Sequence, residues 1–173
     1  MTEAINIAVA GSHKVGKTSV FEEIITGSLS LSYNIEFFNE FALEKISEAD
    51  TFFKYMGMQE DILTHQIKVL KWAKENEVST FSDRCLIDNL TYMIVGRESP
   101  YAYALSDDFN SSLEIIKVLS PVVSEAIAHF YHYDLIFYIP IEFKLGSPTD
   151  EQILYQRIID DAIRHLLNVY GIK

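Results

Sequence analysis

The sequence has few of the residues that mark secreted, membrane-spanning or metal-cluster proteins. It contains one cysteine, Cys85, in 173 residues, which excludes an intrachain disulfide and a multi-cysteine zinc site. No apolar run approaches the roughly 20 residues that cross a bilayer, and the first residues, Met-Thr-Glu-Ala, lack the basic and apolar regions of a signal peptide. We therefore expect a cytoplasmic protein with no membrane partner.

Basic residues are also scarce. The chain has 14 Lys and Arg against 25 Asp and Glu, a formal charge of −11. This balance argues against extended non-specific binding to nucleic acid, although Lys14, Lys17, Arg84 and Arg157 could still line a local basic cleft. The length and the 49% hydrophobic content predict one domain, residues 1–173, with a sizeable core.

The most informative segment that is present is Gly-Ser-His-Lys-Val-Gly-Lys-Thr at positions 11–18, which matches the phosphate-binding pattern G-x-x-x-x-G-K-[ST]. Residues 5–10 before it read as a buried strand, and residues 18–25 after it read as a helix with one apolar face. Backbone N–H groups in such a loop face an anion at the helix N-terminus. Lys17 would reach the β- and γ-phosphates of a nucleoside triphosphate, and the Thr18 hydroxyl would bind Mg²⁺. The predicted nucleotide-binding residues of the loop are Gly11, Ser12, His13, Lys14, Val15, Gly16, Lys17, Thr18 and Ser19.

The remaining chain alternates between strand and helix patterns. Further strands are expected at 35–38, 78–82 and 134–140, and further helices at 41–49, 58–75, 87–95, 111–131 (interrupted at Pro121) and 150–170. Residues 97–110 read as irregular and 141–149 as a loop. Such alternation predicts an α/β fold with a mostly parallel sheet covered by helices on both faces. The apolar residues of 62–73 and 111–131 are also compatible with a homodimer.

Polar residues follow the ends of the predicted strands, where ligands bind in parallel sheets. Asp83 follows the third strand and would hold Mg²⁺ or its water, and Arg84 would clamp a phosphate. Glu40 follows the second strand and would take the proton of an attacking hydroxyl. Asp88 and Tyr92 lie four and eight residues after Arg84, so the three share a helix face.

This combination resembles a known class of proteins. The loop at 11–18, Glu40, the stretch S-D-R-C-L-I-D-N-L-T-Y at 82–92 and Y-D-L-I-F-Y at 133–138 look like the nucleoside and nucleotide kinases of the P-loop class. Thymidylate-kinase-like proteins, and the AAA-type ATPase family that contains nicotinamide-riboside kinase domains, are the nearest in pattern. The resemblance implies a three-layer P-loop NTPase fold, with ATP and Mg²⁺ as cofactors.

The resemblance also implies roles for individual residues. Asp83 would support the metal or act as base, Arg84 would grip the acceptor or the transferred phosphoryl group, and Glu40, Gln66 and Asp88 would contact the acceptor. Residues 141–151 would form a lid over ATP, with Lys144 and Arg157 as its basic residues.

Three departures from the pattern bear on the substrate. No Arg follows Glu40 within 41–44, unlike many relatives of the nicotinamide-riboside type, and the stretch 144–150 contains no Arg. Many relatives continue beyond the position corresponding to residue 173 into a fifth strand, so we expect an abbreviated adenine pocket.

The sequence as a whole favours an ATP- and Mg²⁺-dependent phosphotransferase acting on a nucleoside or nucleoside monophosphate. A P-loop kinase acting on a modified base in DNA, and a regulatory nucleotide-binding ATPase without a small-molecule acceptor, remain alternatives. A GTPase is disfavoured because neither N-K-x-D nor D-x-x-G occurs. His129 and His132 have no third metal ligand nearby in sequence, so an aromatic cluster explains them better than a metal pair.

Overall fold

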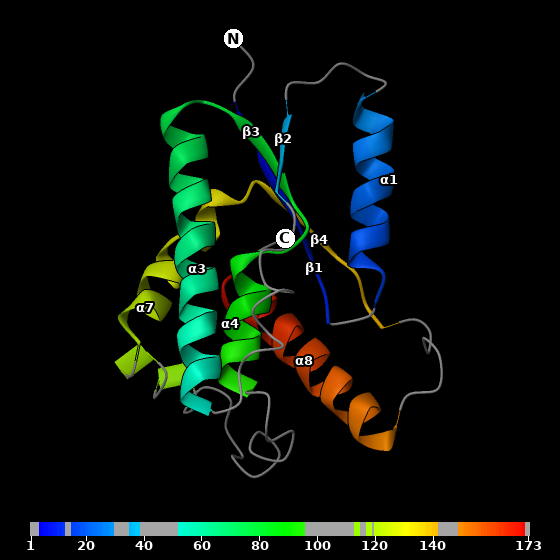
Figure 1. Cartoon of the computed structure of the whole chain (residues 1–173), viewed down its shortest axis with the longest axis vertical. Helices are drawn as coiled ribbons and strands as arrows, with labels where there is room; N and C mark the ends of the chain where they lie inside the picture. Colours follow the sequence, from blue (N-terminus) through cyan, green and yellow to red (C-terminus); the bar gives the residue numbers. More distant parts are fainter. Residues whose placement is uncertain are drawn as a thin grey trace.

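The computed structural model describes residues 4–12, 15–29, 35–38, 52–95, 113–114, 117–118, 120–141 and 149–171. Figure 1 shows strands and helices alternating along this chain. In order they are β1 (Asn6–Ala10), α1 (Lys17–Leu29), β2 (Ile35–Phe38), α3 (Phe52–Glu75), β3 (Ser79–Ser82), α4 (Leu86–Val95), α7 (Pro121–Ala128), the short 3₁₀ helix η1 (Phe130–His132), β4 (Leu135–Tyr138) and α8 (Asp150–Val169).

The described strands form one parallel sheet of order β2-β3-β1-β4. β1 lies inside the sheet, pairing Ile7 with Phe81 of β3 and with Leu135 of β4. Its position explains its four apolar residues after Asn6, because an inner strand covered on both faces is favoured by apolar side chains. Ala8, Val9 and Ala10 are fully buried.

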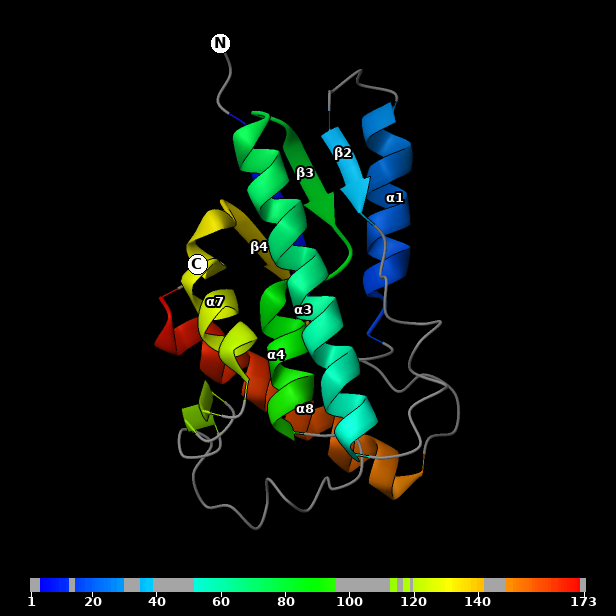
Figure 2. The ribbon, with the colours of Figure 1, turned by 60° about the vertical axis from the view of Figure 1, so that its left-hand side comes forward.

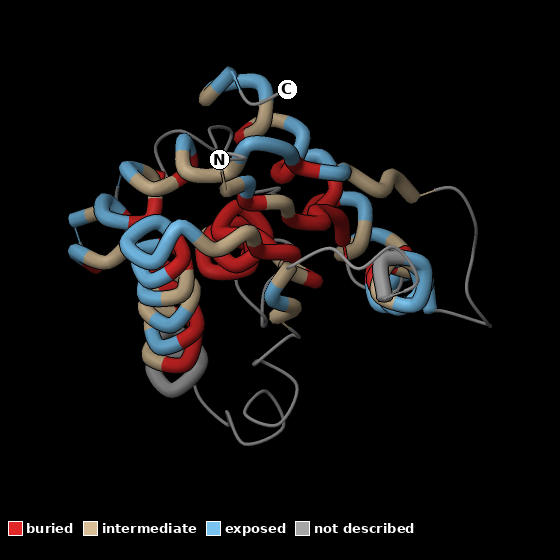
Figure 3. Tube along the Cα trace, turned by 90° about the horizontal axis from the view of Figure 1, so that it is seen from above, coloured by how far each residue is buried: buried red, intermediate tan, exposed pale blue. Residues whose placement is uncertain are grey.

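Helices cover both faces of this sheet and make a three-layer structure (Figures 1 and 2). α1 covers one face, where Phe21 stacks on Phe81 at a centroid distance of 5.1 Å. α3, α4, α7 and α8 cover the other face and form the larger core with Ala8, Ala10 and Ile136. Figure 3 shows the buried residues concentrated at the centre of the molecule, while the outer surfaces of α1 and α3 are exposed.

α4 is the most enclosed helix of the described chain. Of its ten residues only Ile94 is not buried, and the buried set includes the polar residues Asp88, Asn89 and Thr91. It packs against α3 on one side and α8 on the other. Polar groups buried so deeply need hydrogen-bond partners. One partner of Asp88 is the N–H of Gly11, in the loop after β1.

Two helices begin as their sequences predict. Pro121 occupies the first position of α7 after Ser120, where its missing N–H costs nothing. Thr149 caps α8, its hydroxyl accepting from the Gln152 N–H while the Gln152 side chain accepts from the Thr149 N–H. The loop before α8 therefore ends at a firmly defined residue.

The predicted α/β fold, with a parallel sheet flanked by helices, is confirmed. The strand at 35–38 has its predicted bounds, whereas α3 begins at Phe52, six residues before the expected start. The predicted helix 41–49, the segment 97–110 and most of the lid lie outside the described residues. No described helix combines the length and apolarity needed to cross a bilayer.

One observation bears on the expected homodimer, which stays a prediction. The apolar residues of α3 that suggested a dimer face the chain's own core, since Ile62, Leu63, Ile67, Leu70 and Ala73 are all at most 3% exposed. The periodicity at 62–73 therefore reflects internal packing and gives no support for a second copy.

Candidate functional site

The segment between β1 and α1 forms a tight turn whose shape depends on two glycines. Gly16 has φ +92°, a conformation that residues with a side chain rarely adopt. Gly11 lies so close to the neighbouring chain that an added Cβ would be 2.6 Å from the Ile139 carbonyl oxygen. α1 then begins at Lys17, and the Val20 N–H donates to the Gly16 carbonyl at 3.0 Å. The turn thus brings the N-terminus of α1 to the carboxyl end of β1.

Lys17 lies under this turn with 5% of its surface exposed. Its ammonium donates to the carbonyl oxygens of Gly11 and Ser12, both at 2.7 Å. The Ser12 hydroxyl is buried and makes no hydrogen bond within the described part of the chain. A buried cation held by the loop backbone is suited to bind an anion seated in the same loop, because a phosphate oxygen is a stronger acceptor than a carbonyl.

Thr18 and Asp83 meet from opposite sides of the site. The Thr18 hydroxyl donates to Asp83 Oδ2 at 3.1 Å, although the residues belong to the start of α1 and the turn after β3. Asp83 is 3% exposed, and its N–H donates to the Phe38 carbonyl at 3.1 Å, joining the ends of β2 and β3. A hydroxyl and a carboxylate are hard oxygen ligands of the kind Mg²⁺ takes together with phosphate and water. These two residues fit such an ion, and the described residues contain no larger cluster of His, Cys, Asp and Glu suited to a metal.

Asp88 holds the loop to the start of α4. Its carboxylate is completely buried. Oδ1 accepts the Gly11 N–H at 2.9 Å, and Oδ2 accepts the Cys85 N–H at 3.1 Å with Cys85 Sγ at 3.6 Å. Burial, followed by the nearby Asp88 charge, raises the pKa of the Cys85 thiol, which makes this cysteine a packing group.

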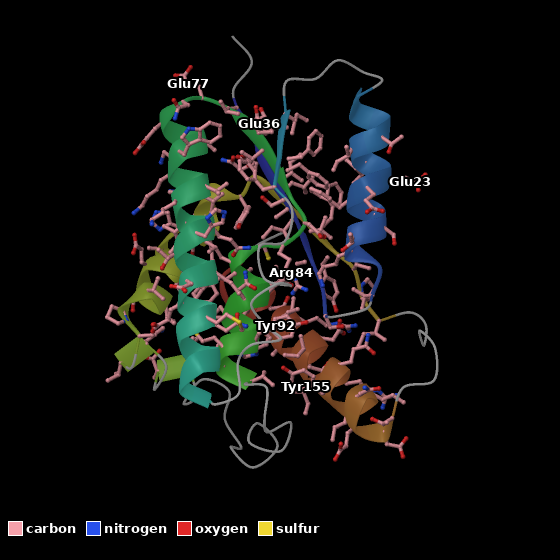
Figure 4. All side chains as sticks on the ribbon, in the orientation of Figure 1. Glu23, Glu36, Glu77, Arg84, Tyr92 and Tyr155 are labelled. Carbon is pink, nitrogen blue, oxygen red and sulfur yellow. The ribbon has the colours of Figure 1, made fainter. Side chains whose placement is uncertain are left out.

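Arg84 lies beside the same turn and packs against α4. Its guanidinium carbon is 5.5 Å from the centroid of the Tyr92 ring. Arg84 precedes the first residue of α4, so it contacts Tyr92 from the turn after β3 and does not share a helix face with Asp88 and Tyr92. Figure 4 shows Arg84, Tyr92 and Tyr155 in the space between α4 and α8, whereas Glu23, Glu36 and Glu77 lie toward the opposite end of the sheet. Burial raises the pKa of Tyr92, and the Arg84 charge opposes that rise. Tyr92 is therefore a neutral neighbour to an arginine close to the phosphate loop.

α3 carries a pair of glutamines, and the predicted contact of Gln66 with an acceptor stays a prediction. Gln66, predicted to contact an acceptor, is half-buried, and Gln59, seven residues earlier on the same helix face, is 2% exposed. Both Oε1 atoms are buried and accept no hydrogen bond from the described residues. Sequence reasoning missed Gln59, and its spacing to Gln66 is the signal that would have found it.

Several predicted residues are not brought together by the described structure. Arg157 and Ser19 are exposed, on α8 and α1 respectively. Glu40, His13, Lys14 and Lys144 lie outside the described residues. Their roles remain predictions.

The structure adds two interactions that no local pattern indicates. The Tyr133 hydroxyl accepts the Leu86 N–H at 3.2 Å and so helps to cap α4; burial raises the pKa of this hydroxyl. At the end of β4 the Tyr138 hydroxyl donates to Asp160 at 2.6 Å and accepts from Arg164 at 2.7 Å. Asp160 and Arg164 also form an ion pair at 2.9 Å. Both interactions fix α4 or α8 relative to the sheet.

Comparison with known proteins places this fold. No protein-family model and no curated protein matches the sequence. Among solved structures, thymidylate kinase from Ehrlichia chaffeensis is similar with a TM-score of 0.56 at 15% identity, over 98% of this chain and 85% of that one. Deoxyadenosine kinase from M. mycoides, whose structure holds dATP, is similar with a TM-score of 0.57 at 22% identity, over 96% of this chain and 87% of that one. The chain therefore has the fold of the P-loop nucleoside and nucleotide kinases.

Proposed function

We propose that this protein is an ATP- and Mg²⁺-dependent phosphotransferase whose acceptor is a nucleoside or nucleoside monophosphate. The observation that carries the proposal is the meeting of Lys17, Thr18 and Asp83 at the carboxyl ends of β1 and β3, with Thr18 and Asp83 in direct contact at 3.1 Å. The helices that follow these adjacent strands cover opposite faces of the sheet. Ligands of open α/β sheets bind in the crevice that such an arrangement leaves.

On the donor side the chain supplies positive charge and N–H groups. The 11–18 loop and the start of α1 would hold the triphosphate, and the Lys17 ammonium would exchange its two carbonyl partners for phosphate oxygens. Thr18 and Asp83 would hold Mg²⁺, which when bound neutralises charge on the phosphates.

On the acceptor side, Arg84 would hold the acceptor or the transferred group. The oxygen of the acceptor hydroxyl forms a bond to the γ-phosphorus while the bond from that phosphorus to the β–γ bridging oxygen of ATP breaks. The hydroxyl proton passes to a carboxylate, for which Glu40 and Asp83 are the candidates. Phe38, two residues before Glu40, is hydrogen-bonded to the Asp83 N–H, so the chain leaves β2 beside this site. Gln59 and Gln66 would offer amide groups to a polar acceptor such as a base.

The test is ADP release from ATP and Mg²⁺ across nucleosides, nucleoside monophosphates, nicotinamide riboside and duplex DNA carrying a modified base. We expect ADP release with one free nucleoside or nucleotide as acceptor. Lys17→Ala should abolish this release, because it removes the ammonium group that is bonded to the Gly11 and Ser12 carbonyls. Lys68→Ala is the matched control, since Lys68 is exposed on α3. Arg84→Ala should also lose transfer.

Each other result selects another function. Transfer only to modified DNA would assign a DNA-modifying kinase, and slow hydrolysis unaffected by any acceptor would assign a regulatory ATPase. Unchanged transfer in Lys17→Ala or in Arg84→Ala would refute the proposed site. A cytoplasmic location also stays a prediction, which fractionation of the producing cell would check.

A further inference from the structure

We propose that Asp88 is a positioning residue that sets the distance between the phosphate-binding loop and the Asp83-Arg84 turn. The inference rests on the proposed function, because it assigns the loop to the phosphoryl donor and the turn to the metal and acceptor. Asp88 would touch neither substrate. This replaces the acceptor contact that the sequence suggested for it, since both carboxylate oxygens are already bound to the chain.

The contacts of Asp88 join two segments that are distant in sequence. Oδ1 accepts the N–H of Gly11, the first residue of the loop, and Oδ2 accepts the N–H of Cys85, the residue after Arg84. Asp88 is the third residue of α4, which is where an acidic side chain reaches back to the N–H that precedes a helix. Such a side chain ordinarily uses one oxygen, and here the other oxygen crosses to β1.

A second contact links the same segments, but it involves groups with another task. Thr18 donates to Asp83 across the site, and both residues are the proposed ligands of Mg²⁺. Binding of the ion therefore reorganises that contact. The bonds of Asp88 involve only backbone N–H groups and a buried thiol, so nothing in the proposed reaction displaces them. Asp88 would hold the two halves of the site at a fixed separation throughout turnover.

Burial makes this connection effective. The Asp88 side chain is 0% exposed, so water does not compete for its oxygens. Hydrogen bonds to a carboxylate in such surroundings are stronger than neutral ones. Phosphoryl transfer depends mainly on positioning and charge stabilisation, and a small misplacement of the reacting groups lowers the rate of chemistry more than the affinity for each substrate.

The closing experiment compares Asp88→Asn with Asp134→Asn. Asp134 is the matched control because its Oδ2 accepts the Asn6 N–H at 2.6 Å, at the beginning of β1 instead of its end. The asparagine at position 88 presents an acceptor to one N–H group and a donor to the other, so one bond is lost. We expect kcat to fall by about tenfold to a hundredfold with the KM for each substrate little changed. The asparagine at position 134 keeps an oxygen that can accept the single Asn6 N–H, so we expect Asp134→Asn to change neither kcat nor the melting temperature.

The outcomes separate this inference from the proposed function. If wild-type protein transfers no phosphoryl group, both fail together, and the wild type alone reveals it. If wild type is active and Asp88→Asn keeps the wild-type kcat, whether or not its stability changes, the positioning role is wrong. If Asp88→Asn does not fold, hydrogen exchange of the Gly11 amide in the wild-type protein tests the positioning role instead. Protection of the Gly11 N–H that persists on binding Mg²⁺ and a non-hydrolysable ATP analogue supports the role, and free exchange in either state overturns it.

Discussion

Replacing Gly11 by alanine should destabilise the protein through a steric conflict that can be located on one atom. The new Cβ would lie 2.6 Å from the Ile139 carbonyl oxygen and 3.0 Å from Val15 Cγ2. The carbonyl cannot easily withdraw, because Ile139 is fixed to β1 by the hydrogen bond from its N–H to the Ala10 carbonyl at 2.8 Å. The loop must therefore move instead, away from the position in which it holds Lys17.

The size of the effect follows from the cost of overpacking. Forcing an extra carbon into a filled position costs about 1–3 kcal/mol. For a chain of this length each kcal/mol changes the melting temperature by about 2–4 °C. Gly11→Ala should therefore melt roughly 2–12 °C below wild type.

Gly27→Ala is the matched control substitution, for which we expect the melting temperature to rise instead of fall. Gly27 is an exposed residue of α1, and a Cβ there meets no heavy atom within 4 Å. Alanine is favoured over glycine inside a helix by up to about 1 kcal/mol, so this variant should melt about 2–4 °C above wild type. The same chemical change thus separates a packing constraint from helix propensity.

Thermal unfolding followed by circular dichroism measures both variants. A melting temperature of Gly11→Ala equal to wild type would refute the close approach of the loop to Ile139. A drop in Gly27→Ala as large as that in Gly11→Ala would show that any side chain on either glycine is harmful, and the argument from Ile139 would then be lost.

Two further predictions concern residues outside the proposed reaction. Tyr138→Phe removes the donor that lies 2.6 Å from Asp160, a residue that is 3% exposed. Among the described side chains, the ion pair with Arg164 is then the remaining partner of the Asp160 carboxylate. We expect the free energy of unfolding, measured by urea denaturation, to fall by about 1–3 kcal/mol. Tyr131→Phe is the control and should leave this free energy unchanged, because Tyr131 is 71% exposed. Burial, followed by the charges of nearby basic residues, lowers the pKa of His132 below 6.5. The unfolded chain then takes up a proton first, so stability falls as the pH drops below about 6.5, and His132→Gln should show a smaller difference in unfolding free energy between about pH 7.5 and about pH 5.5.

Each of these two predictions has a clear contrary result. Equal urea midpoints for the two tyrosine variants would mean that the Tyr138 hydroxyl contributes nothing to holding α8. A pH dependence in His132→Gln equal to that of wild type would assign the acid sensitivity to other groups.

The sequence predicted those features that arise within one continuous segment. Positions 11–18 carry the fixed residues of the loop, and the apolar residues on either side indicate the strand and helix that frame it. The predicted strand at 35–38 is apolar at every position except Glu36, and Asp83 could be placed at a sheet edge because it directly follows the strand pattern at 78–82. The predicted helix at 150–170 begins at Asp150, and Pro121, predicted to interrupt 111–131, is the first residue of α7.

The features that the sequence did not reveal depend on packing between distant segments. Asp88 and Gly11 are 77 residues apart, and their bond exists only because α4 packs against the sheet below β1. The same holds for Tyr133 and the Leu86 N–H, which are 47 residues apart. Periodicity identifies the buried face of a helix, but not which polar group on that face finds a partner.

Contacts between distant segments also affect which substitutions can test a mechanism, because one residue can have both a chemical and a structural role. Asp83 is the proposed metal ligand, but its N–H also binds the Phe38 carbonyl, and its carboxylate also binds Thr18. Loss of activity in Asp83→Ala would therefore combine a lost ligand with a lost connection between α1 and β3. The described contacts of Asp88 are to the chain's own N–H groups and thiol, whereas Lys17 lies under the loop and would exchange its bonds to the Gly11 and Ser12 carbonyls for bonds to phosphate. The pair Lys17→Ala and Asp88→Asn therefore separates charge stabilisation from positioning, because the first should weaken nucleotide binding and the second should leave binding intact while chemistry slows.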